Sequence, residues 1–229
     1  LDGRIVSFPL GPLGKNGVTR TIGYDTVDRI THTQHAGNGT ASALDQRYFY
    51  DGLDRLTGFD AANVSHGFSY DKNGNRSAAR FGGTTYKYTT SSASNRLNST
   101  TGPAPAKVNT YDAAGNITTD GTIRYSYAPG GRLQSAQAGG IKTSYHYNGF
   151  GQRVAKSEQG RLIAHYVYDD QGHLLGEYDG TGQQIQETIY LGDLPIAVVT
   201  PAQGSKPPGI HYIYTDHLQT PRVITRASD

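Results

Sequence analysis

Two histidines, His32 and His35, have a spacing that two ligands of one metal ion could use. A zinc site needs at least a third protein ligand, and usually an ordered helix or hairpin that holds the set in place. This pair lies in a polar stretch that runs into a Gly-Asn-Gly segment at residues 37–39, and the chain contains no cysteine. We therefore interpret the pair as part of a solvated loop and expect no metal site there.

Three aspartates, Asp169, Asp170 and Asp179, offer the hard oxygen ligands that calcium prefers. Their spacing does not match a dense ligand loop such as that of an EF-hand. An aspartate that begins a turn also accepts a hydrogen bond from the backbone two residues further on, which explains the doublet without a metal ion. We favour the turn and predict no calcium site.

Asp216 and His217, with Thr215 and Thr220 nearby, contain the residue types of a nucleophile, a base and an orienting acid. Neighbouring residues of a strand point to opposite faces, so Asp216 could orient His217 only where the chain turns. No other feature of a nucleophile site accompanies them. We favour a structural turn ahead of Pro221 and predict that the chain has no catalytic residue.

The composition favours a polar sheet over a close-packed globular core. Of 229 residues, 35% are hydrophobic, and tyrosine, with 17 copies against 6 phenylalanines, is the main large side chain. Cores usually draw on leucine, isoleucine, valine, phenylalanine and methionine, whereas this chain has no methionine and 30 glycines. Such a chain suits a sheet with one wet face, or repeats that share a thin core.

The charge balance and the missing residue types exclude several classes of function. With 21 basic and 19 acidic residues, the net charge of +2 gives no basis for a nucleic-acid partner. The absence of cysteine rules out disulfides, thiolate metal sites and a cysteine nucleophile. No apolar run is long enough for a membrane helix. We expect no nucleic acid, no membrane insertion by this segment and no cofactor.

A unit that begins with Tyr-Asp recurs about every twenty residues, a spacing typical of repeat architectures. The clearest copies begin at Tyr24-Asp25, Tyr50-Asp51, Tyr70-Asp71, Tyr111-Asp112 and Tyr168-Asp169, and looser copies begin at Tyr127, Tyr147 and Tyr178. Because so many copies share one pattern, the chain is interpreted as an array of one structural unit.

The unit predicts a β-hairpin. An aromatic residue usually stands two positions before the tyrosine, as with Tyr48 and Tyr50, so two rings share one face of a strand and can form cross-strand pairs. The aspartate can start a turn, and Gly115, or Asp28 and Asp54 in other copies, would supply the left-handed conformation that the turn needs. We find no helical period and predict an all-β chain of repeated hairpins.

Arginine follows many of the predicted turns. The set could form a basic stripe, but the net charge near zero favours a structural role instead. In that role each arginine pairs with a turn aspartate or stacks on a tyrosine of the next hairpin. The residues concerned are Arg29, Arg55, Arg76, Arg96, Arg132 and Arg153.

The repeated Tyr-Asp-x-x-Gly-Arg-Leu unit resembles the Rhs/YD repeat, which occurs in bacterial Rhs and wall-associated polymorphic toxins, in toxin-complex shells and in animal teneurins. The segment from Asp216 to Arg222 is similar to the Asp-His-Leu-Gly-Thr-Pro-Arg signature that opens the Rhs-associated core in the bacterial branch, with Gln219 at the glycine position. The residues that carry the resemblance, to which we assign a structural role, are Tyr24, Asp25, Tyr50, Asp51, Tyr70, Asp71, Tyr111, Asp112, Gly115, Tyr168, Asp169, Asp216, His217, Leu218, Pro221 and Arg222.

The resemblance implies an extended, curved, spiralling sheet of hairpins that forms part of a hollow shell. In the family the shell encloses a toxic C-terminal domain, and the core region ends in an aspartyl self-cleavage site. We recognise neither the cleavage motif nor a toxin domain in these residues, so the resemblance implies a wall segment without enzyme activity. The implied partners are a toxin or effector polypeptide and the remaining parts of the shell, in a secreted or cell-surface bacterial protein.

A second function stays open, because exposed tyrosines beside asparagine and aspartate also make sugar-binding surfaces. One aromatic doublet per repeat is already explained by cross-strand packing, which weighs against this reading. The alternative function is therefore a carbohydrate or cell-surface binding module that uses exposed tyrosines.

Segments rich in proline and glycine suggest how the chain is organised. We divide it into a hairpin array at residues 1–200, a Pro/Gly loop at 201–209 and the start of the Rhs-associated core strand at 210–229. A shorter segment at 102–106 is predicted to be a surface loop. The first residues read like the middle of a repeat, so we expect a piece of a longer protein. Its open edge strands predict self-association.

Overall fold

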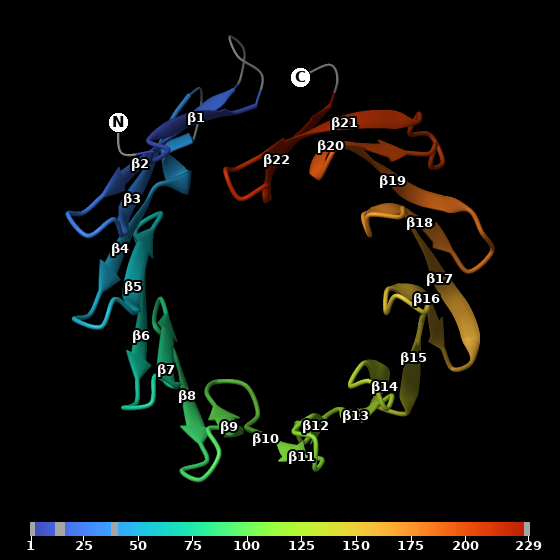
Figure 1. Cartoon of the computed structure of the whole chain (residues 1–229), viewed down its shortest axis with the longest axis horizontal. Helices are drawn as coiled ribbons and strands as arrows, with labels where there is room; N and C mark the ends of the chain where they lie inside the picture. The colour runs from blue at the N-terminus through green and yellow to red at the C-terminus, as the bar shows by residue number, and fades with distance from the viewer. Residues whose placement is uncertain (1–2, 12–16, 38–40, 227–229) are drawn as a thin grey trace. The chain divides into compact units, whose positions relative to one another are not determined.

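The computed structural model describes residues 3–11, 17–37 and 41–226. Within these ranges the chain forms 22 β-strands and one four-residue 3₁₀ helix, η1 (Ala41–Leu44), so the predicted all-β fold of repeated hairpins is confirmed. Figure 1 shows that, within each sheet, the strands follow one another in chain order. The short η1 is the one departure from the predicted absence of helix in the described part of the chain.

The chain divides into two compact units, Leu1–Val108 and Asn109–Asp229, each with one antiparallel sheet whose strands pair in sequence order. The described strands of unit 1 are β1 (Ser7–Leu10), β2 (Val18–Tyr24), β3 (Ile30–Ala36), β4 (Gln46–Tyr50), β5 (Leu56–Ala61), β6 (Val64–Tyr70), β7 (Arg76–Phe81), β8 (Thr84–Thr90), β9 (Leu97–Thr101) and β10 (Lys107–Val108).

Unit 2 continues the same pattern of hairpins in a second sheet. Its described strands are β11 (Thr110–Tyr111), β12 (Ile117–Thr119), β13 (Arg124–Tyr127), β14 (Leu133–Ala138), β15 (Ile141–Tyr147), β16 (Arg153–Glu158), β17 (Arg161–Tyr168), β18 (Leu174–Asp179), β19 (Gln184–Leu191), β20 (Leu194–Thr200), β21 (Gly209–Thr215) and β22 (Pro221–Arg226).

The two predicted loops lie between strands. Residues 102–106 are exposed and join β9 to β10, just before the boundary between the units. Residues 201–208 join β20 to β21, and Gln203 and Lys206 exchange two backbone hydrogen bonds of 3.0 Å within them. The division of the chain at residues 201–209 stays a prediction. The boundary between the two compact units lies elsewhere, after Val108.

Alternating burial along the strands follows from the pleat. In β8, Tyr86 and Tyr88 are half-buried whereas Lys87 between them is exposed, so the aromatic doublet shares one face. Across β4 to β8 the rings on that face contact one another: the Phe59 ring stacks on His66 with centroids 4.4 Å apart, and Phe81 meets Tyr86 edge-on at 6.1 Å. The predicted cross-strand aromatic pairs are thus present in unit 1.

The fully buried positions are few and mostly small. Ala79, Ala164 and Ala197 are buried near the middle of β7, β17 and β20, and Leu10 is the largest side chain that is almost fully buried among the described residues. Little apolar area leaves water in such a sheet, so hydrophobic burial alone gives it limited stability. Polar contacts between neighbouring hairpins are therefore expected to contribute a large part of the stability of the array.

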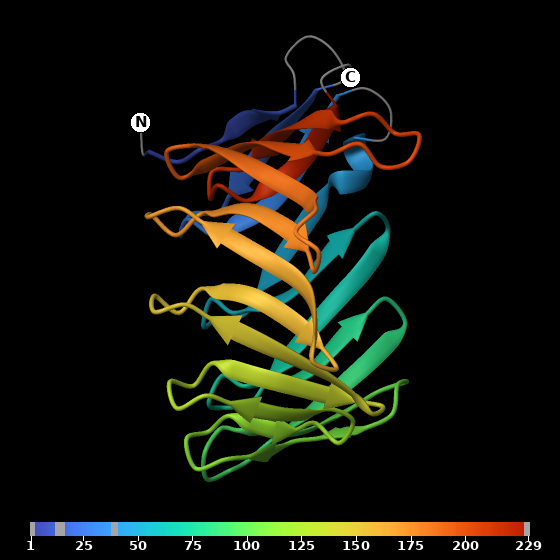
Figure 2. The ribbon, with the colours of Figure 1, turned by 90° about the vertical axis from the view of Figure 1, so that its right-hand side faces the viewer.

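One turn geometry recurs directly after the tyrosine of the Tyr-Asp units. After Phe49 pairs with Gly58, the register shifts and Tyr50 pairs with Leu56, which leaves five residues in the turn. The same shift follows β2, β6, β13, β15, β17 and β21. In Figure 2 the turns near residues 130, 150 and 170 follow one another along one edge of unit 2.

The fourth turn residue after the tyrosine has a left-handed backbone, as the sequence predicts. Asp28 and Asp54 have φ angles of 68° and 61°, and Gly115 has φ 91°. An L-residue in this region costs about 1–2 kcal/mol, a cost that glycine escapes. Aspartate is among the residues that tolerate it best, because its short side chain can bond the local backbone.

Replacing Gly115 tests the turn conformation. Gly115→Ala should destabilise unit 2 by about 1–2 kcal/mol, because alanine is forced into the left-handed region. Gly149 lies in another turn without a left-handed φ, and an added Cβ would meet open space there. Gly149→Ala is therefore the control, and it should leave the stability unchanged or slightly raised. Urea denaturation measures both, and equal midpoints for the two variants would contradict the turn geometry.

Candidate functional site: the Tyr-Asp turns

The aspartate of each unit holds its own turn closed. Asp51 Oδ1 accepts hydrogen bonds from the backbone N–H groups of Leu53 at 2.9 Å and Arg55 at 3.0 Å, while Oδ2 accepts one from Arg55 Nε at 2.7 Å. Asp25 accepts the same set from Val27 and Arg29. One carboxylate thus satisfies two backbone donors and pairs with one guanidinium, which explains why the unit begins with Tyr-Asp.

Other copies keep this arrangement with different partners. At Asp71 and Asp112 the amides of Asn75 and Asn116 replace the guanidinium, each donating to Oδ2 at 2.9 Å. At Asn148 the first residue is itself an amide, and its Oδ1 still accepts two backbone N–H groups of the turn. In these copies the backbone-bonding oxygen is kept and the second partner varies, whereas in the Tyr127 copy Ala128 stands at the aspartate position and the turn closes through backbone bonds with Arg132 and Gly131.

Tyrosine hydroxyls link each hairpin to the one before it. Tyr50 donates to the carbonyl oxygen of Ile30 at 2.8 Å, and Tyr70 donates to that of Leu56 at 2.7 Å. Tyr147 and Tyr168 repeat the bond in unit 2, to the carbonyl oxygens of residues 133 and 153. The accepting residue opens the strand after the preceding turn, so the tyrosine joins neighbouring hairpins directly.

The arginines complete the link between hairpins. Arg29 lies 5.0 Å from the centre of the Tyr50 ring, and Arg55 lies 4.8 Å from that of Tyr70. Arg29 also reaches Asp54 in the next turn, at 2.7 Å. The predicted structural role is confirmed for these arginines and for two others that lie over a tyrosine of the next hairpin, Arg76 and Arg153. Arg132 instead donates to the carbonyl oxygen of Gly151 at 3.0 Å.

Asp216 forms a turn of the same kind before β22. Its carboxylate is almost fully buried, with 2% of the side chain exposed. Oδ1 accepts the N–H groups of Leu218 and Thr220, and Oδ2 accepts a bond from Arg222 Nε at 2.7 Å. The carboxylate oxygens serve the turn and Arg222, which supports the structural turn over an orienting role toward the exposed His217.

Gln219, which stands at the glycine position of the signature that the segment resembles, has a left-handed backbone. Its φ is 59°, in the left-handed region, and its N–H donates to the Asp216 carbonyl at 2.9 Å. The turn therefore closes even though glutamine occupies this position. Leu218, at the tip, is strongly exposed, and Pro221 opens β22.

The interpretation of His32 and His35 as a solvated loop is wrong, because both residues lie in β3. They are three positions apart, so their side chains point to opposite faces of the strand and cannot share one ion. His35 is buried: its Nδ1 lies 3.1 Å from Asp45 Oδ1, and Arg20 Nε donates to its Nε2 at 2.8 Å. Sequence reasoning missed this cluster because Asp45 and Arg20 are brought together only by strand pairing.

The aspartates considered for calcium belong to two different turns. Asp169 and Asp179 stand at opposite ends of β18, and each carboxylate accepts hydrogen bonds from its own turn. Asp170 is exposed. Across the described residues no group of three or more histidine or acidic side chains is arranged to hold a metal ion.

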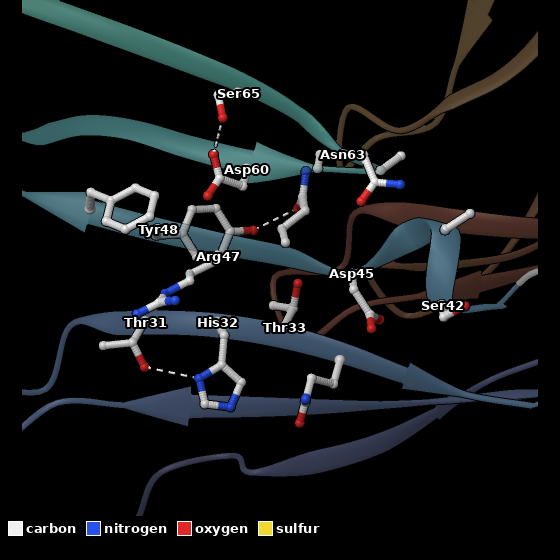
Figure 3. Close-up of a pocket in the computed structure, with 16 residues that line it drawn as sticks. Thr31, His32, Thr33, Ser42, Asp45, Arg47, Tyr48, Asp60, Asn63 and Ser65 are labelled. Carbon is white, nitrogen blue, oxygen red and sulfur yellow. Dashed lines mark hydrogen bonds between the residues drawn. The ribbon is translucent and has the colours of Figure 1, made fainter.

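An open hollow of about 1240 Å³ lies in unit 1 where β3 and β4 diverge around η1. Figure 3 shows many polar side chains along it, with Thr31 bonded to His32 and Ser65 bonded to Asp60. The Thr33 hydroxyl is buried without a hydrogen-bond partner at this position.

Comparison with known proteins identifies the family. The teneurin YD-shell family matches residues 14–228. The chain belongs to this family. No curated protein matches it significantly. In the structures called TcdB2-TccC3 and Photorhabdus luminescens Tc holotoxin pore, the matches reach TM-scores of 0.71 and 0.57 at 15% and 12% identity.

The chain spans only a small part of the length of these matched chains. The match with TcdB2-TccC3 covers 98% of this chain and 14% of that chain, and the match with the holotoxin covers 91% and 14%. A third structure, TcdB2-TccC3 without its hypervariable C-terminal region, matches with a TM-score of 0.57 at 12% identity over 92% of this chain and 14% of the other. At such identities the likeness shows the fold, and the fold is that of a shell segment.

Hydrogen bonding lowers the pKa of the aspartate carboxyls in the Tyr-Asp turns. Burial alone would raise the pKa of Asp51 and Asp216, but the bonds from the turn backbone and from the arginines outweigh it. The pKa of Asp71 and Asp112 is lowered chiefly by the side-chain amides that they accept bonds from. Charged carboxylates are therefore the form that the folded turns stabilise.

No helix in the described ranges is long and apolar enough to cross a membrane.

Sequence reasoning missed His173, although it noted the arginines that follow the turns. The fifth residue after the tyrosine is arginine in two turns of unit 1, Arg29 and Arg55, and it is His173 in the Tyr168 turn. Aligning the copies on their tyrosines would have revealed this exchange.

Substitution of Asp216 should separate its two roles. Asp216→Ala leaves two backbone N–H groups and Arg222 without their acceptor and should destabilise unit 2 by about 2–3 kcal/mol. Asp216→Asn should cost less, because an amide oxygen can still accept the backbone bonds, as Asn148 does. Asp170→Ala, at an exposed turn position, is the control. Equal losses for the alanine and asparagine variants in urea denaturation would contradict this division.

Acid should weaken the turns together. The folded pKa of these carboxyls lies below the unfolded value of about 4, so their stabilisation is present above that pH and is lost as pH falls through the folded values. We expect the thermal midpoint to hold steady down to about pH 4 and then fall. Asp51→Asn should make the fall shallower, because one of the titrating turns is removed. A flat profile down to pH 2 would contradict the assignment.

Proposed function

We propose that this chain is a wall segment of a YD shell that encloses a toxin or effector polypeptide, in a secreted or cell-surface bacterial protein. The observation that carries the proposal is the match of 98% of the chain to a section of the TcdB2-TccC3 chain, combined with the YD-shell family match. Family membership establishes the shell segment, and enclosure of a polypeptide is the step that we add.

The wall can act by confinement. In each sheet the backbone groups of one strand pair with those of the next, and the turns are tied by their own carboxylates. The tyrosine hydroxyls and stacked arginines join successive hairpins, so a partner outside has few unpaired backbone groups to bind. This role needs no catalytic residue, because the wall acts by keeping outside partners away from the enclosed polypeptide.

The edge strands support pairing with the rest of a shell. Within unit 1, β1 has one described neighbour, β2, and within unit 2, β22 has one described neighbour, β21. A strand with one neighbour presents its remaining N–H and C=O groups to another strand. We propose that further hairpins of the shell, or a second copy of this chain, pair with these edges.

The carbohydrate-binding alternative draws little support from the turn tyrosines. Tyr50, Tyr70 and Tyr147 are half-buried, and their hydroxyls already donate to a neighbouring hairpin. A ring that stacks on a sugar needs an open face, whereas the rings of Tyr50 and Tyr70 lie under guanidinium groups. These tyrosines are explained by the structure of the wall.

Native mass spectrometry of the purified chain tests the proposal. We expect a bound polypeptide or a defined multimer, because open edges and an enclosing surface favour partners. Asp216→Ala, which disturbs the turn that carries the edge strand β22, should reduce assembly, whereas Asp170→Ala should not. A clean, folded monomer at high concentration would count against the wall segment, and binding to a glycan array by that monomer would favour the alternative.

A further inference from the structure

In unit 2 a histidine side chain links two neighbouring hairpins, and we call this link a joint. His173 is the fifth residue after Tyr168 and therefore stands where Arg29 and Arg55 stand in unit 1. Its Nδ1 lies 2.7 Å from Asp169 Oδ2, in its own turn between β17 and β18. Its Nε2 lies 2.9 Å from Asp193 Oδ1, in the turn between β19 and β20. The imidazole thus bridges two turns.

The contacts of His173 match those that Arg29 makes between two hairpins of unit 1. Arg29 bonds Asp25 in its own turn at 2.7 Å and Asp54 in the next turn at 2.7 Å, and it lies over the Tyr50 ring. His173 likewise stacks on a tyrosine of the next hairpin, Tyr190, with ring centroids 4.6 Å apart and planes 20° from parallel.

The difference between the two joints is that imidazole titrates near neutral pH, whereas guanidinium stays charged. Both ring nitrogens of His173 face carboxylate oxygens, and carboxylates only accept hydrogen bonds. The protonated ring can donate to both aspartates. The neutral ring keeps one N–H and must turn a lone pair toward one carboxylate, so it can hold only one of the two turns.

We propose that His173 is a pH-dependent joint of the wall, which ties the β17–β18 turn to the β19–β20 turn when it is protonated and releases Asp193 when it is neutral. Asp193 is the contact that is lost because its side chain is 77% exposed and can be solvated, whereas Asp169 is 20% exposed and anchored by the His173 backbone N–H. The stacking of His173 on Tyr190 does not depend on Asp193, so the two hairpins stay in contact when Asp193 is released.

The direction of the pH effect follows from the charges around the ring. The charged groups that contact His173 are Asp169, from its own turn, and Asp193, from the neighbouring turn. Hydrogen bonding to Asp169, with a smaller contribution from Asp193, raises the pKa of His173 despite partial burial. Burial and the charge of Asp169 raise the pKa of Tyr190, so the phenol stays neutral in this range. The joint is therefore complete below about pH 6.5 and opens as pH rises through the folded pKa.

Imidazole NMR titration of the whole chain between pH 5 and 9 tests the joint, with His173→Gln used to assign the resonance. We expect His173 to titrate above about 6.5 and Asp193→Asn to shift its midpoint downward. Asp193 is strongly exposed, so this variant should fold. A His173 midpoint at or below 6.5, or one that Asp193→Asn leaves unchanged, would overturn the proposal.

Thermal unfolding supplies a second readout. His173→Arg converts the joint to the permanently charged form, so the melting temperature of the wild type should fall relative to this variant between pH 6 and 8.5. His146→Gln, at an exposed histidine of β15, is the control and should track the wild type across this range. Parallel profiles for the wild type and His173→Arg would overturn the proposal independently of the enclosing function.

Discussion

The structure depends on a carboxylate that closes its own turn. In the five-residue turns that begin with aspartate, Oδ1 accepts backbone N–H groups of the turn, as Asp51 does from Leu53 and Arg55. These bonds offset the cost of a left-handed residue, about 1–2 kcal/mol for an L-amino acid. The offset explains how Asp54 and Gln219 can occupy positions where glycine would be strain-free.

Closed turns are necessary but would leave the hairpins independent of one another. Neighbouring hairpins are coupled by their backbone ladder, by the tyrosine hydroxyl and by the cation stacked on the tyrosine ring. Each coupling reaches only the adjacent hairpin, so stability accumulates along the chain as in other linear repeat arrays. With small residues such as Ala79 and Ala164 at the buried positions, these polar couplings take over work that a thicker apolar core does elsewhere.

The local features of this fold were predictable from the sequence because the repeat is a local code. The turn aspartates, the left-handed Asp28 and Gly115 and the paired aromatics follow from neighbours a few positions apart. The failures concern contacts that only strand pairing creates. The polar neighbours of His35 in the sequence predicted a loop. In the structure, hydrogen bonds with Arg20 on β2 and Asp45 after η1 offset the cost of burying the imidazole in β3.

The strands are shortest next to the boundary between the two units. β10 and β11 contain two residues each, whereas β17 and β19 contain eight. The chain before β10 carries Pro103 and Pro105, which have no N–H to donate to a ladder. Few ladder bonds give little cooperative coupling between neighbouring strands. The boundary between the two sheets falls where the strands are shortest, and the prolines before β10 remove backbone donors that a ladder would use.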